Sequence, residues 1–241
     1  MTEHVWIFGD SFAERWVDIE VNGKLAWPIL MEDFYKVENF GKCGSGPEYQ
    51  LNLLTKKINN IENLDDLKNI NLIFILSHSA RINFSFLEPG DQWLSGRLTS
   101  IEQPSWKDLT HDIQEKIQKY KKHVEFVTNF YDFFYFYNNH ETEFYKRISL
   151  LKDLSYMFKK VAVIPVFDNI EEFSLYQLLK ENKNQENFHI AKGIGIGWYA
   201  STDPTDPNHF VERNHVEFFQ MIKKWIDKNI NIDTKKLTKF T

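Results

Sequence analysis

The sequence is poor in cysteine and has no excess of positive charge. Cys43 is the single cysteine among 241 residues, which excludes an internal disulfide framework and a zinc site built from several cysteines. Lysine and arginine total 29 against 34 aspartate and glutamate residues, so the formal net charge is −5. This balance argues against a protein whose main task is to coat nucleic acid, and we predict no nucleic-acid partner.

Long apolar runs and a targeting signal are also lacking. No run approaches the roughly 20 apolar residues that a membrane-spanning helix needs. The chain carries acidic Glu3 and reaches an apolar stretch by Val5, with no basic region and no cleavage site before it. We therefore expect a soluble protein made in the cytoplasm, without a membrane partner. This expectation leaves open release by cell lysis. If the protein is viral, it is expected in the host cytoplasm or as part of a particle.

Short apolar runs alternate with stretches of helical periodicity along the chain. The apolar run His4–Phe8 predicts a buried central strand. Further strands are predicted at Tyr35–Asn39, Asn71–Leu76 and Val161–Val166, with a short fifth candidate at Phe188–Ala191. The helical spacing predicts helices at Glu48–Ile61, Asp108–Tyr137, Glu143–Phe158, Glu171–Lys180 and His215–Ile226. Strands that alternate with helices indicate the α/β class. We expect a three-layer α/β/α sandwich with a central parallel sheet of about five strands.

The chain contains no repeat and no linker between domains. We predict one domain over residues 1–227, followed by a polar, lysine-rich tail over residues 228–241. Residues 85–105 interrupt the alternation with two prolines and two glycines, which is typical of a long loop or lid. Val124–Val127 fits either a strand or part of a helix.

A serine follows the first predicted strand directly, in the segment Gly9-Asp10-Ser11-Phe12. The carboxyl ends of parallel strands are where ligands bind in such sheets, so a serine at this turn points toward a binding crevice. Gly9 permits a tight turn. The segment is equally well explained by Asp10 and Ser11 capping a following helix.

Two further segments supply the chemistry that a serine nucleophile needs. Residues 39–46 hold three glycines, whose backbone N–H groups can stabilise an oxyanion, although a plain turn explains them as well. Asp206 and His209 lie three residues apart near the end of the chain, so one loop can present a base and the carboxylate that orients it. Taken alone, this pair also fits a solvated loop.

In combination, these segments resemble the SGNH (GDSL) hydrolase family. The family's Gly-Asp-Ser block matches Gly9-Asp10-Ser11, its glycine block after the second strand is similar to Asn39–Gly44, and its Asp-x-x-His block matches Asp206 and His209. The resemblance implies an esterase with a flavodoxin-like fold. It implies that Ser11 is the nucleophile, His209 the base and Asp206 its orienting partner, with no metal and no cofactor.

One block departs from the family pattern. After its third strand the family has Gly-x-Asn-Asp, whose Asn donates to the oxyanion, whereas this chain has Ser77-His78-Ser79-Ala80-Arg81. Ser79 is the nearest counterpart by position, and its hydroxyl can donate a hydrogen bond. His78 or Arg81 can also fill this role. We therefore expect an oxyanion hole made by the N–H groups of Ser11 and Gly44, with help from Ser79.

The substrate is expected to be a small-molecule or glycan ester, with a slight preference for deacetylation of a carbohydrate. Candidate substrate-binding residues are Asp10, His78, Arg81, Trp93, Trp198 and His215. The other histidines are scattered without metal-ligand spacing, and the glycines of residues 193–197 lack the spacing of a dinucleotide motif. Two alternatives stay open: a catalytically impaired binding or structural protein of this fold and, ranked lower, a flavodoxin-like nucleotide binder.

Overall fold

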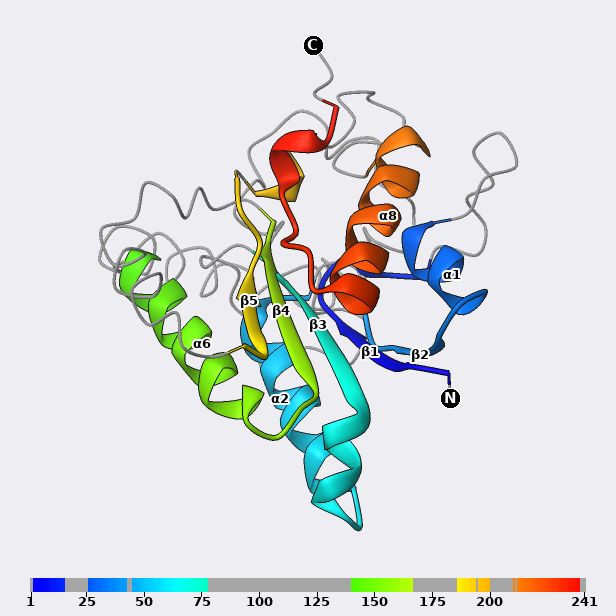
Figure 1. The fold of residues 1–241 in the computed structure, drawn as a ribbon. Helices are drawn as coiled ribbons and strands as arrows, with labels where there is room; N and C mark the ends of the chain where they lie inside the picture. Colours follow the sequence, from blue (N-terminus) through cyan, green and yellow to red (C-terminus); the bar gives the residue numbers. More distant parts are fainter. Residues whose placement is uncertain are drawn as a thin grey trace, which may run out of the picture.

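The computed structural model describes residues 2–15, 26–42, 45–77, 140–166, 186–193, 195–199, 210 and 212–238. The described strands are β1 (His4–Phe8), β2 (Lys36–Asn39), β3 (Ile70–Leu76), β4 (Lys160–Pro165) and β5 (Phe188–Ile190). The described α-helices are α1 (Trp27–Glu32), α2 (Pro47–Asn59), α6 (His140–Ser155) and α8 (Glu212–Lys228), and the 3₁₀ helices are η1 (Leu64–Asn69), η5 (Ile196–Tyr199) and η6 (Thr234–Lys236). Figure 1 shows the strands side by side with helices around them.

The five strands form one sheet in the order β2-β1-β3-β4-β5, and every neighbouring pair is parallel. In register, Ile7 lies between Asn39 of β2 and Ile73 of β3. All seven residues of β3 are buried, as are four of the five residues of β1. Central strands of a parallel sheet are covered on both sides, so they are continuously apolar rather than alternating. The expected α/β class with a parallel sheet is therefore confirmed.

The direction of winding reverses between β1 and β3. From β1 the chain proceeds outward to β2, then returns past β1 to β3 and continues to β4 and β5. In open parallel sheets, a crevice opens outside the carboxyl ends of the strands at such a reversal. Residues that directly follow β1 and β3 are therefore placed where such proteins bind ligands.

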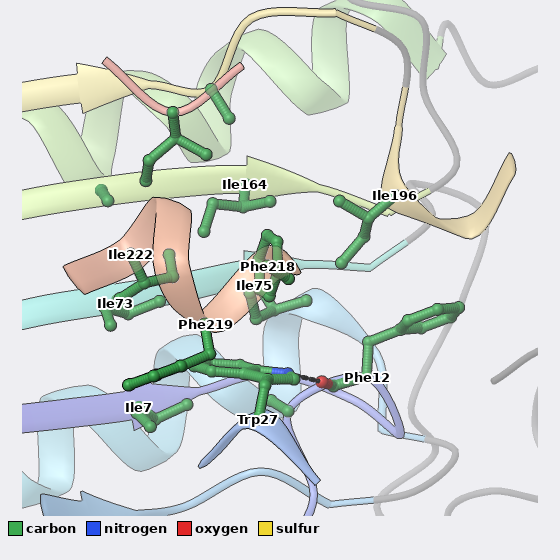
Figure 2. Packing of buried hydrophobic residues seen from close by; sticks show 14 of the residues in the cluster. Ile7, Phe12, Trp27, Ile73, Ile75, Ile164, Ile196, Phe218, Phe219 and Ile222 are labelled. Carbon is green, nitrogen blue, oxygen red and sulfur yellow. Dashed lines mark hydrogen bonds between the residues drawn. The ribbon is translucent and has the colours of Figure 1, made fainter. Parts of the chain in front are cut away.

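Alternate side chains of the strands face two separate clusters of buried residues. Ile7, Ile73 and Ile164 pack with residues of α1 and α8, including Trp27 and Phe218. Figure 2 shows these side chains between the sheet and the two helices. The residues between them on the strands face the second cluster, with α2 and α6. Each face of the sheet is thus in contact with two of the described helices.

Most predicted elements agree with the structure to within a few residues. Helix α2 begins after Gly46 with Pro47 in its first turn, where the missing N–H of proline is tolerated. Helix α1 was not predicted, because a six-residue segment is too short to show helical periodicity. The predicted helices Asp108–Tyr137 and Glu171–Lys180, the loop of residues 85–105 and Val124–Val127 lie outside the described residues.

The segment after α8 differs from the expected polar tail. Ile232, Thr234 and Leu237 are buried, and both apolar residues belong to the cluster with α1 and α8. Asp233 forms a parallel bridge with Lys192, which anchors the segment beside β5. Two apolar side chains spaced five residues apart in a lysine-rich stretch are a weak signal, so the sequence alone did not reveal this packing.

Candidate active site

Ser11 lies in a tight turn directly after β1. The backbone N–H of Ala13 donates to the carbonyl of Asp10 at 2.9 Å, and the N–H of Phe12 donates to Oδ1 of Asp10 at 3.1 Å. A side-chain oxygen that accepts from the backbone two residues on is an Asx turn, which holds a chain reversal in one conformation. Residues 11–15 contain a turn and a bend but no helix, so Asp10 and Ser11 do not cap a helix that follows them directly.

Asp10 is fully buried and joins the ends of two strands. Its Oδ2 accepts a hydrogen bond of 2.8 Å from the hydroxyl of Ser77, the residue that follows β3. Burying a carboxylate costs free energy unless its oxygens are hydrogen-bonded, and both oxygens of Asp10 are. These contacts favour a role for Asp10 in holding the turn over the substrate contact considered from the sequence.

Gly9 makes the turn possible and is itself held from α2. Its φ is +154°, and a Cβ at this position would lie 2.5 Å from Cβ of Ile75, so a larger residue meets strand β3. Its N–H donates to Oε1 of Gln50 at 3.2 Å. Neither Gln50 nor Ser77 was singled out from the sequence. Ser77 was detectable as the first residue after a strong strand, and Gln50 as a polar residue on the buried face of α2.

The described residues of the glycine loop pack against the Ser11 turn. Nδ2 of Asn39 donates to the carbonyl of Ala13 at 2.8 Å, and the N–H of Lys42 donates to the carbonyl of Gly9 at 2.9 Å. A Cβ at Gly41 would lie only 2.4 Å from the carbonyl carbon of Ala13, so the two backbones approach as closely as a glycine allows. The loop predicted to supply an oxyanion donor is therefore in contact with the turn predicted to supply the nucleophile.

Aromatic side chains support the other side of the turn. Nε1 of Trp27 donates to the carbonyl of Phe12 at 2.6 Å, a bond drawn as a dashed line in Figure 2. The rings of Phe12 and Phe210 lie edge to face with centroids 5.2 Å apart, and Phe210 also contacts the ring of His215. Nδ1 of His215 accepts from the backbone N–H of Trp27 at 3.3 Å, so the neutral ring carries its proton on Nε2.

Two other described histidines accept or share structural hydrogen bonds. Nε2 of His189 accepts from the backbone N–H of Ile232 at 3.1 Å, and burial lowers the pKa of this ring to about 4. Nε2 of His4 lies 2.9 Å from Oε1 of Glu38, and burial lowers the pKa of His4 as well. Within the described ranges, no three histidine, cysteine, aspartate or glutamate side chains gather as a metal site.

Several predicted site residues lie outside the described residues. These are His78, Ser79, Arg81 and Trp93, together with Gly44, Asp206 and His209. Trp198 belongs to η5, but its side chain is also outside the description. Of the predicted set, the structure describes Asp10, Ser11 and His215. It places Asp10 and Ser11 in the turn after β1 and His215 on α8, one hydrogen bond away from α1.

The sequence matches no protein-family model, and it has no significant match among curated proteins. Of the helices in the described part of the chain, none has both the length and the apolar character that crossing a membrane requires. Function is therefore argued from the site itself: a buried, hydrogen-bonded turn that presents Ser11 at the carboxyl end of β1, beside the reversal of the sheet.

Proposed function

We propose that the protein is a serine hydrolase of the SGNH type that cleaves carboxylic esters, with Ser11 as nucleophile and His209 and Asp206 as base and orienting carboxylate. The proposal includes the three-layer α/β/α sandwich of that family. It rests on one observation above all: Ser11 lies in a rigid turn at the carboxyl end of β1, where the winding of the sheet reverses.

The rigidity of the turn supports a catalytic role for Ser11. A nucleophile gains rate when it is held in one reactive position before the substrate arrives. Here the turn is held from three directions, by Ser77 after β3, by Gln50 on α2 and by Trp27 on α1. Ser11 itself is 7% exposed, so its surroundings are largely shielded from water. A serine that only capped a surface turn would not need this support.

A contact between the two ends of the chain supports the pairing of Ser11 with His209. Phe12 follows Ser11 in the sequence and Phe210 follows His209, and the rings of Phe12 and Phe210 are in contact. This contact joins the turn after β1 to a residue shortly before α8, although Phe12 and Phe210 are nearly 200 positions apart in the sequence. It is the described contact that bears most directly on the triad.

The proposed reaction has two steps of acyl transfer. His209 accepts the hydroxyl proton of Ser11 while Oγ of Ser11 attacks the ester carbonyl. Asp206 holds the imidazole in the required tautomer. The protonated imidazole then gives its proton to the leaving oxygen, which departs as an alcohol. A water molecule next gives a proton to His209 and attacks the acyl carbon, which releases the carboxylic acid and restores the serine hydroxyl.

The oxyanion is proposed to be stabilised by the backbone N–H groups of Ser11 and Gly44, with Ser79 in place of the family's Asn. The contact of the glycine loop with the Ser11 turn supports this assignment for the loop. Loss of one such donor costs roughly 10²–10³ in rate, so we expect a slower enzyme than one with the Asn. We propose an acylated carbohydrate as substrate, with Trp93 available for stacking on a sugar ring.

The test compares wild type with Ser11→Ala on p-nitrophenyl esters of increasing acyl length, together with fluorophosphonate labelling. We expect Ser11→Ala to lower kcat/KM by about 10³-fold or more and to abolish labelling, because the nucleophile is removed. Its thermal unfolding temperature should stay close to that of wild type. Ser155→Ala removes a buried serine from the end of α6 and serves as the control that keeps full activity.

The alternative outcome is informative as well. If wild type hydrolyses none of the esters and takes up no label, the hydrolase proposal is refuted. A binding or structural role, which the missing Asn already suggested, would then be the better description.

A further inference from the structure

We propose that Gln50 is a positioning residue for this reaction: its side-chain amide locks the Ser11 turn and the glycine loop into one relative geometry. The inference rests on the proposed function and names a residue that the SGNH resemblance does not. Gln50 lies on α2, one turn after the glycine loop ends, and is 1% exposed.

The amide of Gln50 contacts both halves of the proposed site. Its Oε1 accepts from the N–H of Gly9 at 3.2 Å, and its Nε2 donates to Oγ of Ser45 at 2.6 Å. The hydroxyl of Ser45 in turn lies 2.8 Å from the carbonyl of Lys42 and 3.2 Å from the carbonyl of Gly9. We call these four residues, Gly9, Lys42, Ser45 and Gln50, the Gln50 clamp.

The backbone completes the clamp. The N–H of Lys42 donates to the carbonyl of Gly9 at 2.9 Å, so the peptide groups of Gly9 are fixed on both sides. Gly9 is two residues from Ser11, and Lys42 and Ser45 flank Gly44, the proposed oxyanion donor. A shift in the clamp would therefore move the nucleophile and the proposed donor relative to each other.

Packing alone does not call for glutamine at this position. The buried residues of α2 are Pro47, Gln50, Leu54 and Ile58, and Gln50 is the one polar residue among them. An apolar side chain would continue this buried set without the desolvation cost of an amide. A buried amide stabilises a structure only when its hydrogen bonds are made, and then it selects one geometry over its neighbours. This selection is what a preorganised active site requires.

The experiment compares Gln50→Ala with Asn71→Ala, a matched control at the opposite end of the sheet. Asn71 is also fully buried, and its Nδ2 donates two hydrogen bonds, to Glu3 and to the carbonyl of His4, whereas its Oδ1 has no hydrogen-bond partner among the described residues. Both variants remove a buried amide, so both lower the unfolding temperature. We expect only Gln50→Ala to lower kcat, by about ten- to hundredfold with KM within about twofold, because misplacement acts on the transition state.

Gln50→Glu provides the rescue test. A protonated carboxyl can accept from Gly9 and donate to Ser45, as the amide does, whereas a carboxylate cannot donate. Burial raises the pKa of a carboxyl group, so the kcat of this variant relative to wild type should rise between about pH 8 and about pH 6. Amide hydrogen exchange supplies a readout apart from activity: Gly9 and Lys42 should exchange about tenfold faster or more in Gln50→Ala and not in Asn71→Ala.

The outcomes separate the two proposals. If wild type is active and Gln50→Ala keeps its kcat, or if both alanine variants lose kcat equally, the positioning role is refuted while the proposed function stands. If wild type shows neither turnover nor labelling, the proposed function fails and the role of Gln50 in the reaction fails with it. Unchanged exchange at Gly9 and Lys42 would refute the clamp itself.

Discussion

The two ends of the sheet differ in how their carboxylates are held, although each end has a buried amide, Gln50 at the carboxyl ends and Asn71 at the amino ends. At the amino ends of the strands, Lys159 pairs with Glu3 at 2.5 Å. Lys57 pairs with Glu38, the third residue of β2, at 2.7 Å, and all four side chains are about one-third exposed or more. At the carboxyl ends, Asp10, Ser77 and Gln50 are buried. Asp10 accepts a hydrogen bond from Ser77, and Gln50 accepts one from the N–H of Gly9. Exposed ion pairs contribute little free energy, whereas buried hydrogen bonds are costly to break and fix geometry.

This difference concerns how easily the polar contacts at each end can rearrange. An amino-end pair can rearrange without moving the backbone, since water replaces the lost partner. At the carboxyl end, loss of one partner leaves a buried donor or acceptor unsatisfied, so the turn keeps one conformation. The carboxylate of Asp10, at the end that carries Ser11, is therefore held more firmly than the carboxylate of Glu3 at the amino end. Three measurements, on His189, Ser77 and Lys159, test this comparison.

His189 in β5, at one edge of the sheet, extends the comparison to a polar side chain that contacts the segment after α8. Burial lowers its folded-state pKa to about 4, whereas the unfolded value is about 6.5. The unfolded state therefore binds the proton first, so this contribution to stability is complete above about pH 6.5 and is lost as the pH falls toward 4. The difference between the two pKa values corresponds to about 3 kcal/mol of folding free energy, and partial exposure of the ring reduces the expected loss to about 2 kcal/mol.

The measurement is the free energy of unfolding by urea between about pH 7 and about pH 4. His189→Gln is the control, because its amide can still accept from the N–H of Ile232 and does not titrate. The difference between wild type and the variant isolates the histidine from the carboxylates. An identical pH dependence in the two proteins would contradict the assigned pKa shift.

Ser77→Ala should cost about 1 to 2 kcal/mol, because it removes a donor from a buried carboxylate oxygen of Asp10. Ser155→Ala is the matched change: this serine is equally buried but donates to the neutral carbonyl of Lys152, so its loss should cost about 1 kcal/mol or less. Chemical denaturation of both variants gives the comparison. Equal or reversed losses would show that the carboxyl end is no more sensitive than the rest of the protein.

Lys159→Met should have the smallest effect, about 0.5 kcal/mol or less, because its pair with Glu3 is exposed to solvent and screened by salt. Burial raises the pKa of Glu3, but hydrogen bonds from Lys159 and Asn71 outweigh this and leave it lowered. The difference in free energy of unfolding between Lys159→Met and wild type should therefore become smaller still when salt is added. A loss as large as that of Ser77→Ala would end the distinction between the two ends of the sheet.

The sequence predicted the central strands β1, β3 and β4 well, because each is a run of mostly apolar residues that is typical of a buried parallel strand. The outer strands β2 and β5 are shorter, less apolar and only partly buried. Helix α8 was predicted for a similar reason, since its apolar residues Phe218, Phe219, Ile222 and Ile226 recur at helical spacing. Helix α1 was missed because its stability comes from Trp27, which packs on Phe218 of α8. That contact joins residues nearly 200 positions apart, beyond the reach of any local pattern.

The candidate site also has a part that local sequence patterns predict and a part that only tertiary contacts determine. The sequence by itself determined the strands, the class of fold and the position of Ser11 just after the first strand, because these depend on local patterns of apolar residues and glycine. Only the tertiary structure decided that β1 lies between β2 and β3, and that Ser77, Gln50 and Asn39 therefore converge on the Ser11 turn. The reason is physical: strand order and buried hydrogen bonds between distant residues follow from how the layers pack, and no short segment encodes them alone.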